Sequence, residues 1–235
     1  VKKIRITGGE PLVRKNILQL FNSIGKKIGS GLEELTVTTN GSQLERYAKD
    51  LFKNGVKRIN ISLDTLDKNK FKLITRNGDF NKVIKGINAA KESGMKVKIN
   101  TVALKGINDN EILNLVNWCG ENKFALTFIE VMPMGAIDEK RANQYMSLID
   151  VKSLIQTKYS LTDDPLKTGG PARYVHCHET DQKIGFITPH THNFCETCNR
   201  VRITCTGEMY MCLGQEDNLD LKKPLRKSEN NVFLK

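Results

Sequence analysis

The chain has 235 residues, of which 39% are hydrophobic and 27% are charged. This is the composition of an ordinary globular protein, and no apolar run approaches the ~18 residues that a membrane-spanning helix needs. The formal net charge of +11 invites an anionic ligand. The lysines, however, are dispersed among acidic residues in segments typical of solvent-exposed helices. We therefore predict a cytoplasmic protein without a membrane or nucleic-acid partner.

The first 135 residues repeat one pattern: a short β-branched run, a turn and an amphipathic helix. The predicted strands are KKIRIT, ELTVTT, RINISL, KVKINTV and LTFIEV, and the predicted helices span residues 14–29, 42–54, 68–76, 80–93 and 109–122. Strands that alternate with helices predict a parallel sheet. The remainder contains a helix in DVKSLIQTKY, then short β runs and Gly/Pro turns. We predict an α/β domain at 1–135 and a separate domain at 136–235.

Polar residues stand at the carboxyl ends of the predicted strands, at positions 7–10, 38–40, 62–64, 100 and 130–132. In a β/α barrel the loops at this end converge on the active site. Asn40 and Asp64 have an alternative interpretation as turn formers or helix caps. Gly8 and Gly9 allow the backbone to come close to a ligand, and the Glu10 carboxylate can hold an ammonium group. The set predicts a site that suits an amino-acid moiety.

The cysteines predict a metal site. Cys195, Cys198 and Cys212 follow C-x2-C-x13-C spacing, and Cys205 lies between them. Clustered cysteines in a chain of this kind favour metal over disulfides. Three thiolates can hold a [4Fe–4S] cluster with one open iron. With Cys205 or a histidine at 190 or 192 as fourth ligand, they can instead hold a structural zinc ion.

Basic residues near these cysteines favour the cluster. Arg200 and Arg202 would project to the same side of an extended strand, where a structural zinc ion gains nothing from them. A phosphate-bearing ligand beside an open cluster would need such cations, because arginine binds phosphate bidentately. Lys3, Arg5 and Lys98 on predicted strands can supply further positive charge.

Six segments together carry a family resemblance. In order and spacing, VKKIRITGGEPLVR, LTVTTNG, INISLD, FIEVMPMG, GGPARY and IGFITPHTHNFCETCNRVR closely resemble the radical S-adenosylmethionine (SAM) GTP 3′,8-cyclase family. The resemblance implies an incomplete (β/α)6 TIM-like barrel, without its first strand, and a C-terminal α+β domain with a second Fe–S cluster. It also implies the first step of molybdenum cofactor (molybdopterin) biosynthesis, from GTP to (8S)-3′,8-cyclo-7,8-dihydroguanosine 5′-triphosphate. In that reaction a 5′-deoxyadenosyl radical abstracts the ribose 3′ hydrogen, and the carbon radical attacks guanine C8.

The resemblance also implies roles for individual residues. The positions that match SAM contacts are Gly8, Gly9, Glu10, Pro11, Ser62 and Met132. The positions that match ligands of the second [4Fe–4S] cluster are Cys195, Cys198 and Cys212. The positions that match GTP contacts are Arg5, Thr38, Lys98, Arg200, Val201 and Arg202, to which we add Lys3. The resemblance further implies a homodimer, an electron donor of unidentified type and transfer of the product to cyclic pyranopterin monophosphate synthase.

The sequence also departs from the family pattern. The C-x3-C-x2-C motif of the family's first [4Fe–4S] cluster and the paired glycines of its C-terminal tail are not in this sequence, so we expect a fragment that is inactive by itself. Thr127 stands where some members carry arginine, and we expect Cys205 to be a small buried residue. Two alternatives remain: another radical SAM enzyme with an auxiliary cluster, and a zinc-stabilised RNA-binding module.

Overall fold

The computed structural model describes residues 1–131, 143–165, 170–189, 200–211 and 217–227. The chain divides into two compact units, Val1–His192 and Asn193–Lys235. Among the helices that the structure describes, none combines the length and the hydrophobicity needed to cross a bilayer.

In its described residues, the first unit contains an eight-stranded sheet with the order β1-β2-β3-β4-β5-β8-β7-β6. Its strands are β1 (Lys3–Ile6), β2 (Glu34–Thr39), β3 (Val56–Ser62), β4 (Lys96–Ala103), β5 (Ala125–Glu130), β6 (Leu161–Asp164), β7 (Arg173–Cys177) and β8 (Gln182–Ile187). Neighbouring strands from β1 through β5 to β8 pair in parallel, whereas β8, β7 and β6 pair antiparallel. The predicted α/β class and all five predicted strands are confirmed.

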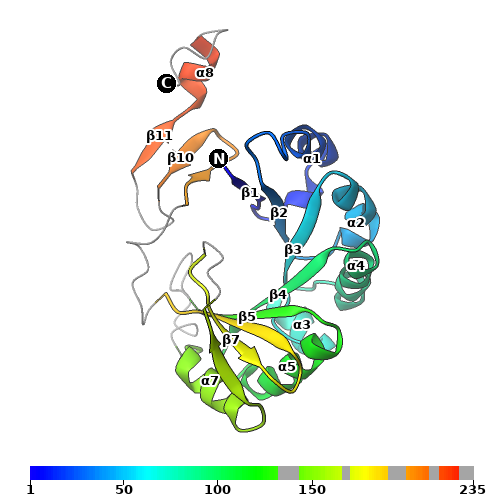
Figure 1. Cartoon of the computed structure of the whole chain (residues 1–235), viewed down its shortest axis with the longest axis vertical. Helices are drawn as coiled ribbons and strands as arrows, with labels where there is room; N and C mark the ends of the chain where they lie inside the picture. The colour runs from blue at the N-terminus through cyan, green and yellow to red at the C-terminus, as the bar shows by residue number, and fades with distance from the viewer. Residues whose placement is uncertain (132–142, 166–169, 190–199, 212–216, 228–235) are drawn as a thin grey trace. The chain divides into compact units, whose positions relative to one another are not determined.

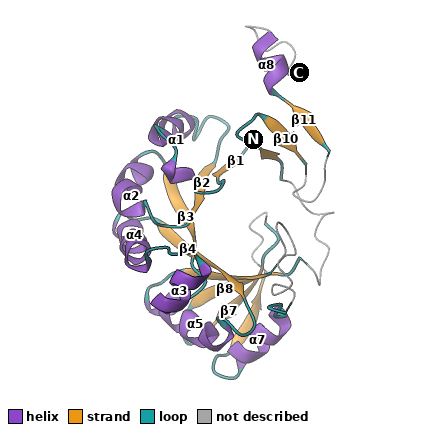
Figure 2. Cartoon of the chain, turned by 180° about the vertical axis from the view of Figure 1, so that it is seen from behind, coloured by secondary structure: helices purple, strands orange, loops and turns teal. Residues whose placement is uncertain are grey.

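Helices cover one side of this sheet. They are α1 (Ile17–Gly25), α2 (Leu44–Lys53), α3 (Lys68–Ile74), α4 (Phe80–Glu92), α5 (Ile112–Glu121) and α7 (Leu148–Gln156), with 3₁₀ turns η1 (Pro11–Val13) and η2 (Asp109–Glu111). In Figures 1 and 2 the sheet is curved, and α1, α2, α4 and α5 lie on its outer side. The predicted helices are therefore confirmed, with shorter ends at both termini of the first one.

Local sequence explains why these helices form where they do. In α4 the Asp79 side chain accepts a hydrogen bond from the Lys82 backbone N–H at 3.2 Å, which caps the helix N-terminus. Val83, Ile87 and Ala90 follow at helical spacing and are buried. Gly94 then ends the helix with a φ of 87°, which a residue with a side chain rarely adopts.

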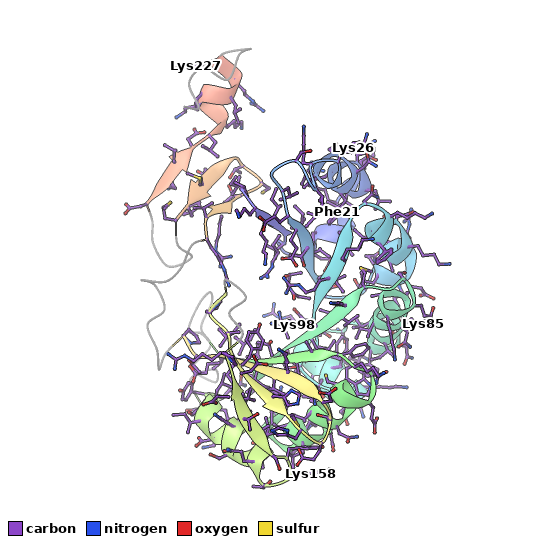
Figure 3. All side chains as sticks on the ribbon, in the orientation of Figure 1. Phe21, Lys26, Lys85, Lys98, Lys158 and Lys227 are labelled. Atoms are coloured by element: carbon purple, nitrogen blue, oxygen red, sulfur yellow. The ribbon has the colours of Figure 1, made fainter. Side chains whose placement is uncertain are left out.

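The two faces of the sheet differ in chemistry because side chains alternate along each strand. One register row consists of Ile61, Ile99, Leu126, Ile184 and Val175, all buried in the core. The adjacent row contains Thr38, Asn60 and Lys98, all polar. Because the helices take the apolar face, the polar residues are left on the inner face. Figure 3 shows Lys98 on that inner side, whereas Lys26 and Lys85 lie out at the helices.

The second unit contains a three-stranded antiparallel sheet of β9 (Arg202–Ile203), β10 (Glu208–Tyr210) and β11 (Asn218–Asp220), followed by α8 (Lys222–Lys227). The predicted domain boundary at 135/136 stays a prediction. The compact units divide at 192/193 instead, because β8 pairs in parallel with β5 and so joins the region after 136 to the first sheet.

Candidate functional site

Glu10 is fixed at the carboxyl end of β1 by three donors. Its Oε1 accepts hydrogen bonds from the Thr39 hydroxyl at 2.7 Å and from the Leu12 N–H at 3.0 Å. Its Oε2 accepts one from the Asn40 N–H at 2.6 Å. The carboxylate therefore joins the ends of β1 and β2, and Oε2 keeps lone-pair capacity for a further donor such as an ammonium group.

The loop before Glu10 has room beside it. Gly8 has a φ of 151°, which an L side chain rarely adopts. A Cβ added to Gly8 or Gly9 would meet no heavy atom within 4 Å. The backbone here is thus open, as a loop that closely approaches a ligand must be. Pro11 is buried at the start of η1 and sets the exit of the chain from this loop.

The loops after β3 and β4 are joined by polar contacts. Asp64 Oδ1 accepts a hydrogen bond from the Val102 N–H at 2.8 Å, and the Asn108 side-chain NH₂ donates to the carbonyls of Asp64 and Val102. Burial raises the pKa of the Asp64 carboxyl, against the opposing hydrogen bond from Val102. Asp64 is not the helix cap that we considered, because Asp67 caps α3. Asn40 is the expected turn former, since its Oδ1 accepts from the Ser42 N–H.

Ser62, a predicted SAM contact, is exposed at the end of β3, where it lies in register with Asn100 of β4. Thr38 is the penultimate residue of the neighbouring strand β2 in the same sheet, and its Oγ1 accepts a hydrogen bond from the Asn60 side chain at 3.3 Å. The sheet therefore brings predicted SAM and nucleotide positions to adjacent strands.

The sequence did not reveal the partners of two predicted cations on the inner face, Lys3 and Lys98. The partner of Lys3 is Glu34. Glu34 forms ion pairs with Lys3 Nζ at 2.6 Å and with Arg58 Nη2 at 2.8 Å, and Arg58 Nε also donates to it at 2.9 Å. Burial tends to raise the pKa of Glu34, but the hydrogen bonds from Lys3 and Arg58 outweigh it and lower the pKa. Register alone could have found this cluster, because Lys3 pairs with Glu34 on β2.

Lys98 has a different partner. Its Nζ donates a hydrogen bond to the Tyr174 hydroxyl at 2.8 Å, from β4 to β7 across the intervening strands. Burial lowers the pKa of Lys98, and the nearby charges of Arg58 and Arg5 act in the same direction, while Tyr174 opposes them. A partly buried cation in this setting can serve as a partner for an anionic group.

The remaining predicted site residues either lie outside the described residues or belong to the second unit. Met132 and the predicted cluster ligands lie outside the described residues; those ligands are Cys195, Cys198 and Cys212. Within the described part of the chain, no group of three or more His, Cys, Asp or Glu is arranged to hold a metal ion. Arg200 and Val201 precede β9, and Arg202 is its first residue. Cys205 is exposed in the turn after β9, so our expectation that it is buried was wrong.

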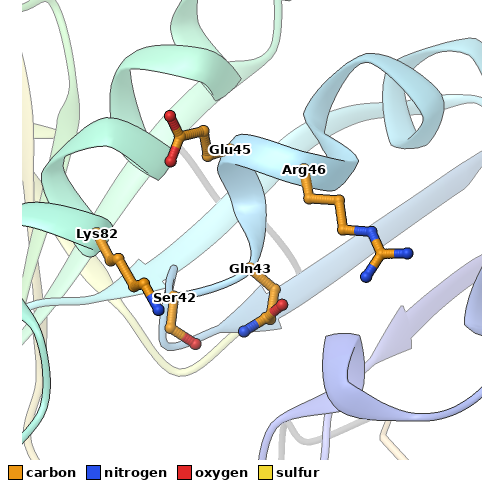
Figure 4. Close-up of a pocket in the computed structure, with 5 residues that line it drawn as sticks. All are labelled: Ser42, Gln43, Glu45, Arg46 and Lys82. Atoms are coloured by element: carbon orange, nitrogen blue, oxygen red, sulfur yellow. The ribbon is translucent and has the colours of Figure 1, made fainter.

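A shallow depression on the helix side of the sheet is separate from these residues. It is lined by Ser42, Gln43, Glu45, Arg46 and Lys82, from the start of α2 and from α4 (Figure 4). None of the predicted site residues that the structure describes lines it, and its charges are mixed. The inner face and the carboxyl ends of the strands therefore remain the candidate site.

Family models match both parts of the chain. Residues 1–119 match the Radical SAM superfamily, and residues 124–235 match Molybdenum Cofactor Synthesis C. Solved structures agree on the fold: Streptococcus suis SuiB bound to SAM superimposes with a TM-score of 0.64 at 17% identity, over 93% of this chain and 52% of that one. SuiB bound to its precursor peptide SuiA gives a TM-score of 0.66 at 18% identity, over 94% of this chain. The chain spans about half of those structures, and its fold is that of a radical SAM protein.

Two relatives with high sequence identity show which radical SAM family the chain belongs to. The chain is 58% identical over 234 residues to GTP 3′,8-cyclase of Rhizobium etli (strain CIAT 652), covering 100% of this chain and 67% of the relative. It is 57% identical over 236 residues to GTP 3′,8-cyclase of Paracoccus denitrificans (strain Pd 1222), covering 100% of this chain and 69% of that relative. The chain belongs to the GTP 3′,8-cyclase family, radical SAM enzymes of molybdenum cofactor synthesis.

Proposed function

We propose that this chain supplies the SAM loop and the nucleotide-binding face of a radical SAM GTP 3′,8-cyclase. The observation that carries the proposal is that the first sheet has an open loop at one strand end and a group of cations on its inner face. The open Gly8–Glu10 loop occupies the carboxyl end of β1, and cationic side chains occupy the inner face of β1, β3 and β4. An amino-acid group suits the first, and a triphosphate suits the second.

The residues at the loop fit SAM. Glu10 is held by three donors and retains acceptor capacity on Oε2, which suits the ammonium group of the methionyl part. Gly8 and Gly9 leave open space where side chains would stand. We propose further SAM contacts at Pro11, Ser62 and Met132. When bound, SAM together with a reduced iron–sulfur cluster supplies a 5′-deoxyadenosyl radical.

The inner face fits GTP. Lys98 offers a partly buried ammonium held by a neutral hydroxyl. Thr38 offers a hydroxyl in the same register row, with Asn60 between it and Lys98. Lys3 and Arg5 lie on β1 of the same sheet. These residues would orient the triphosphate, so that the protein contributes positioning and exclusion of water rather than acid–base chemistry.

The second unit carries the remaining part of the proposal. Cys195, Cys198 and Cys212 hold a second [4Fe–4S] cluster with one open iron, and Arg200, Val201 and Arg202 bind GTP. The proposal includes an incomplete (β/α)6 barrel and a functional domain boundary at 135/136. It also includes a homodimer in the cytoplasm, an unidentified electron donor, and transfer of the product to cyclic pyranopterin monophosphate synthase. The resemblance to the family supports these points.

A charge-matched pair of variants tests the nucleotide face. Lys98→Met and Lys85→Met remove the same charge, but Lys98 lies on the inner face and Lys85 is exposed on α4 (Figure 3). Loss of a charge-assisted hydrogen bond to phosphate predicts about tenfold weaker GTP binding for Lys98→Met. Equilibrium binding of GTP to the iron-loaded protein, without SAM, measures it. Equal affinities of the two variants would contradict the assignment of this face to GTP.

A further inference from the structure

The ammonium group of Lys98 has a neutral partner. Its Nζ lies 2.8 Å from the Tyr174 hydroxyl and 5.0 Å from the centre of the tyrosine ring, so the hydroxyl makes the closer contact. The neighbouring cations Lys3 and Arg58 instead share the Glu34 carboxylate. Within the described part of the chain, no carboxylate pairs with Lys98. Its positive charge is therefore available to an anion.

Small residues let this contact form across the sheet. Lys98 lies in register with Ala125 of β5, and Tyr174 lies in register with Gly185 of β8. A Cβ on Gly185 would stand 3.0 Å from Tyr174 Cε1 and 2.8 Å from Thr127 Oγ1. These distances are shorter than ordinary packing allows. The glycine thus makes room for the tyrosine ring on the inner face.

Holding the charged Lys98 ammonium at this position is electrostatically unfavourable unless another group stabilises it. Lys98 is desolvated by burial, and Arg5 and Arg58 add repulsion, so burial and like charges together lower its pKa. A flexible lysine in that setting would turn toward solvent unless a fixed acceptor held it. Tyr174 is buried, and its strand β7 is hydrogen-bonded to β8. Because the sheet fixes the tyrosine in place, its hydroxyl is a fixed acceptor for the Lys98 ammonium.

We propose that Tyr174 is a positioning residue, whose hydroxyl holds the Lys98 ammonium on the inner face so that it can bind a phosphate group of the nucleotide. The proposal rests on the proposed function, because it takes Lys98 as a substrate-binding residue. It adds a role for a residue of the GGPARY segment that the site assignment did not use. The hydroxyl acts through Lys98 and need not touch the nucleotide.

Tyr174→Phe removes the hydroxyl and keeps the ring. Tyr159→Phe is the matched control, because Tyr159 is also buried and its hydroxyl has no hydrogen-bond partner among the described residues. GTP affinity of the iron-loaded protein, measured without SAM, should fall about tenfold in Tyr174→Phe and stay unchanged in Tyr159→Phe. Thermal unfolding of each variant shows that the fold is retained.

A double-mutant cycle separates positioning from a general structural role. In a Lys98→Met background, Tyr174→Phe should cause no further loss of GTP affinity. Unchanged affinity in the single Tyr174→Phe variant overturns the inference alone if Lys98→Met still weakens binding. A full tenfold loss in the Lys98→Met background also overturns it, because Tyr174 then acts without Lys98. If Lys98→Met itself has no effect, the nucleotide assignment of the proposed function fails as well.

Discussion

Alanine at Gly8 and at Gly9, in the loop that we assign to SAM, should have different effects on stability and the same effect on SAM binding. Gly9 has no positive φ, and an added Cβ would meet no atom within 4 Å. Gly9→Ala should therefore leave the free energy of unfolding unchanged or raise it by about 0.4–1 kcal/mol, because the unfolded chain loses freedom. Gly8 has a φ of 151°, so Gly8→Ala should cost roughly 1–3 kcal/mol.

Both variants place a methyl group in the space that we assign to SAM. Overpacking of a well-fitted site costs about 1–3 kcal/mol, which corresponds to roughly 5- to 150-fold weaker SAM binding. Urea unfolding measures stability, and equilibrium dialysis with labelled SAM measures affinity. Wild-type SAM affinity in Gly9→Ala would refute the placement of SAM at this loop. Equal destabilisation of the two variants would refute the backbone argument.

Three further predictions concern charge and packing in the first unit. Burial raises the pKa of the Asp64 carboxyl, so its contribution to stability is present below its ordinary pKa of 3.8 and is lost as pH rises through the higher pKa of the folded state. Asp64→Asn should therefore stabilise the protein at pH 7 but not below pH 3.8, as measured by thermal unfolding across pH. The pKa of Glu34 is lowered, so its contribution to stability is present above its ordinary pKa of 4.5 and is lost as pH falls through the pKa of the folded state. Glu34→Gln should lower the free energy of unfolding by about 1 kcal/mol at pH 7, and wild-type stability at that pH would contradict the ion pairs. Gly185→Ala should displace the Tyr174 ring, lowering stability by about 1–3 kcal/mol and weakening GTP binding in the same direction as Tyr174→Phe; full GTP affinity would argue against the packing described.

Much of the first unit could be predicted because its signals are local. β-branched runs and amphipathic periods gave all five βα strands and their helices. Helix ends were less accurate: α1 begins at Ile17 rather than near residue 14, because Pro11–Val13 forms a 3₁₀ turn and Asn16 takes a left-handed φ of 59°. Such terminal geometry depends on single residues that a periodic pattern does not reveal.

The rest depends on contacts between distant residues. The place of β8 beside β5 could not be predicted, because the short β run at Gln182–Ile187 carries no signal for its partner. Lys98 was identified as a cation, but its partner Tyr174 lies 76 residues away in the chain. Such a contact is set by sheet order and register, which single-sequence patterns specify weakly.

The proposed function depends above all on an iron–sulfur cluster, held by this chain, that contacts the nucleotide. The most direct test is the iron and sulfide content of protein purified without oxygen, with a paramagnetic resonance spectrum after reduction, recorded with and without GTP. We expect about four irons per chain, held by Cys195, Cys198 and Cys212, and a spectrum that shifts with GTP. One zinc per chain and a spectrum indifferent to GTP would contradict it.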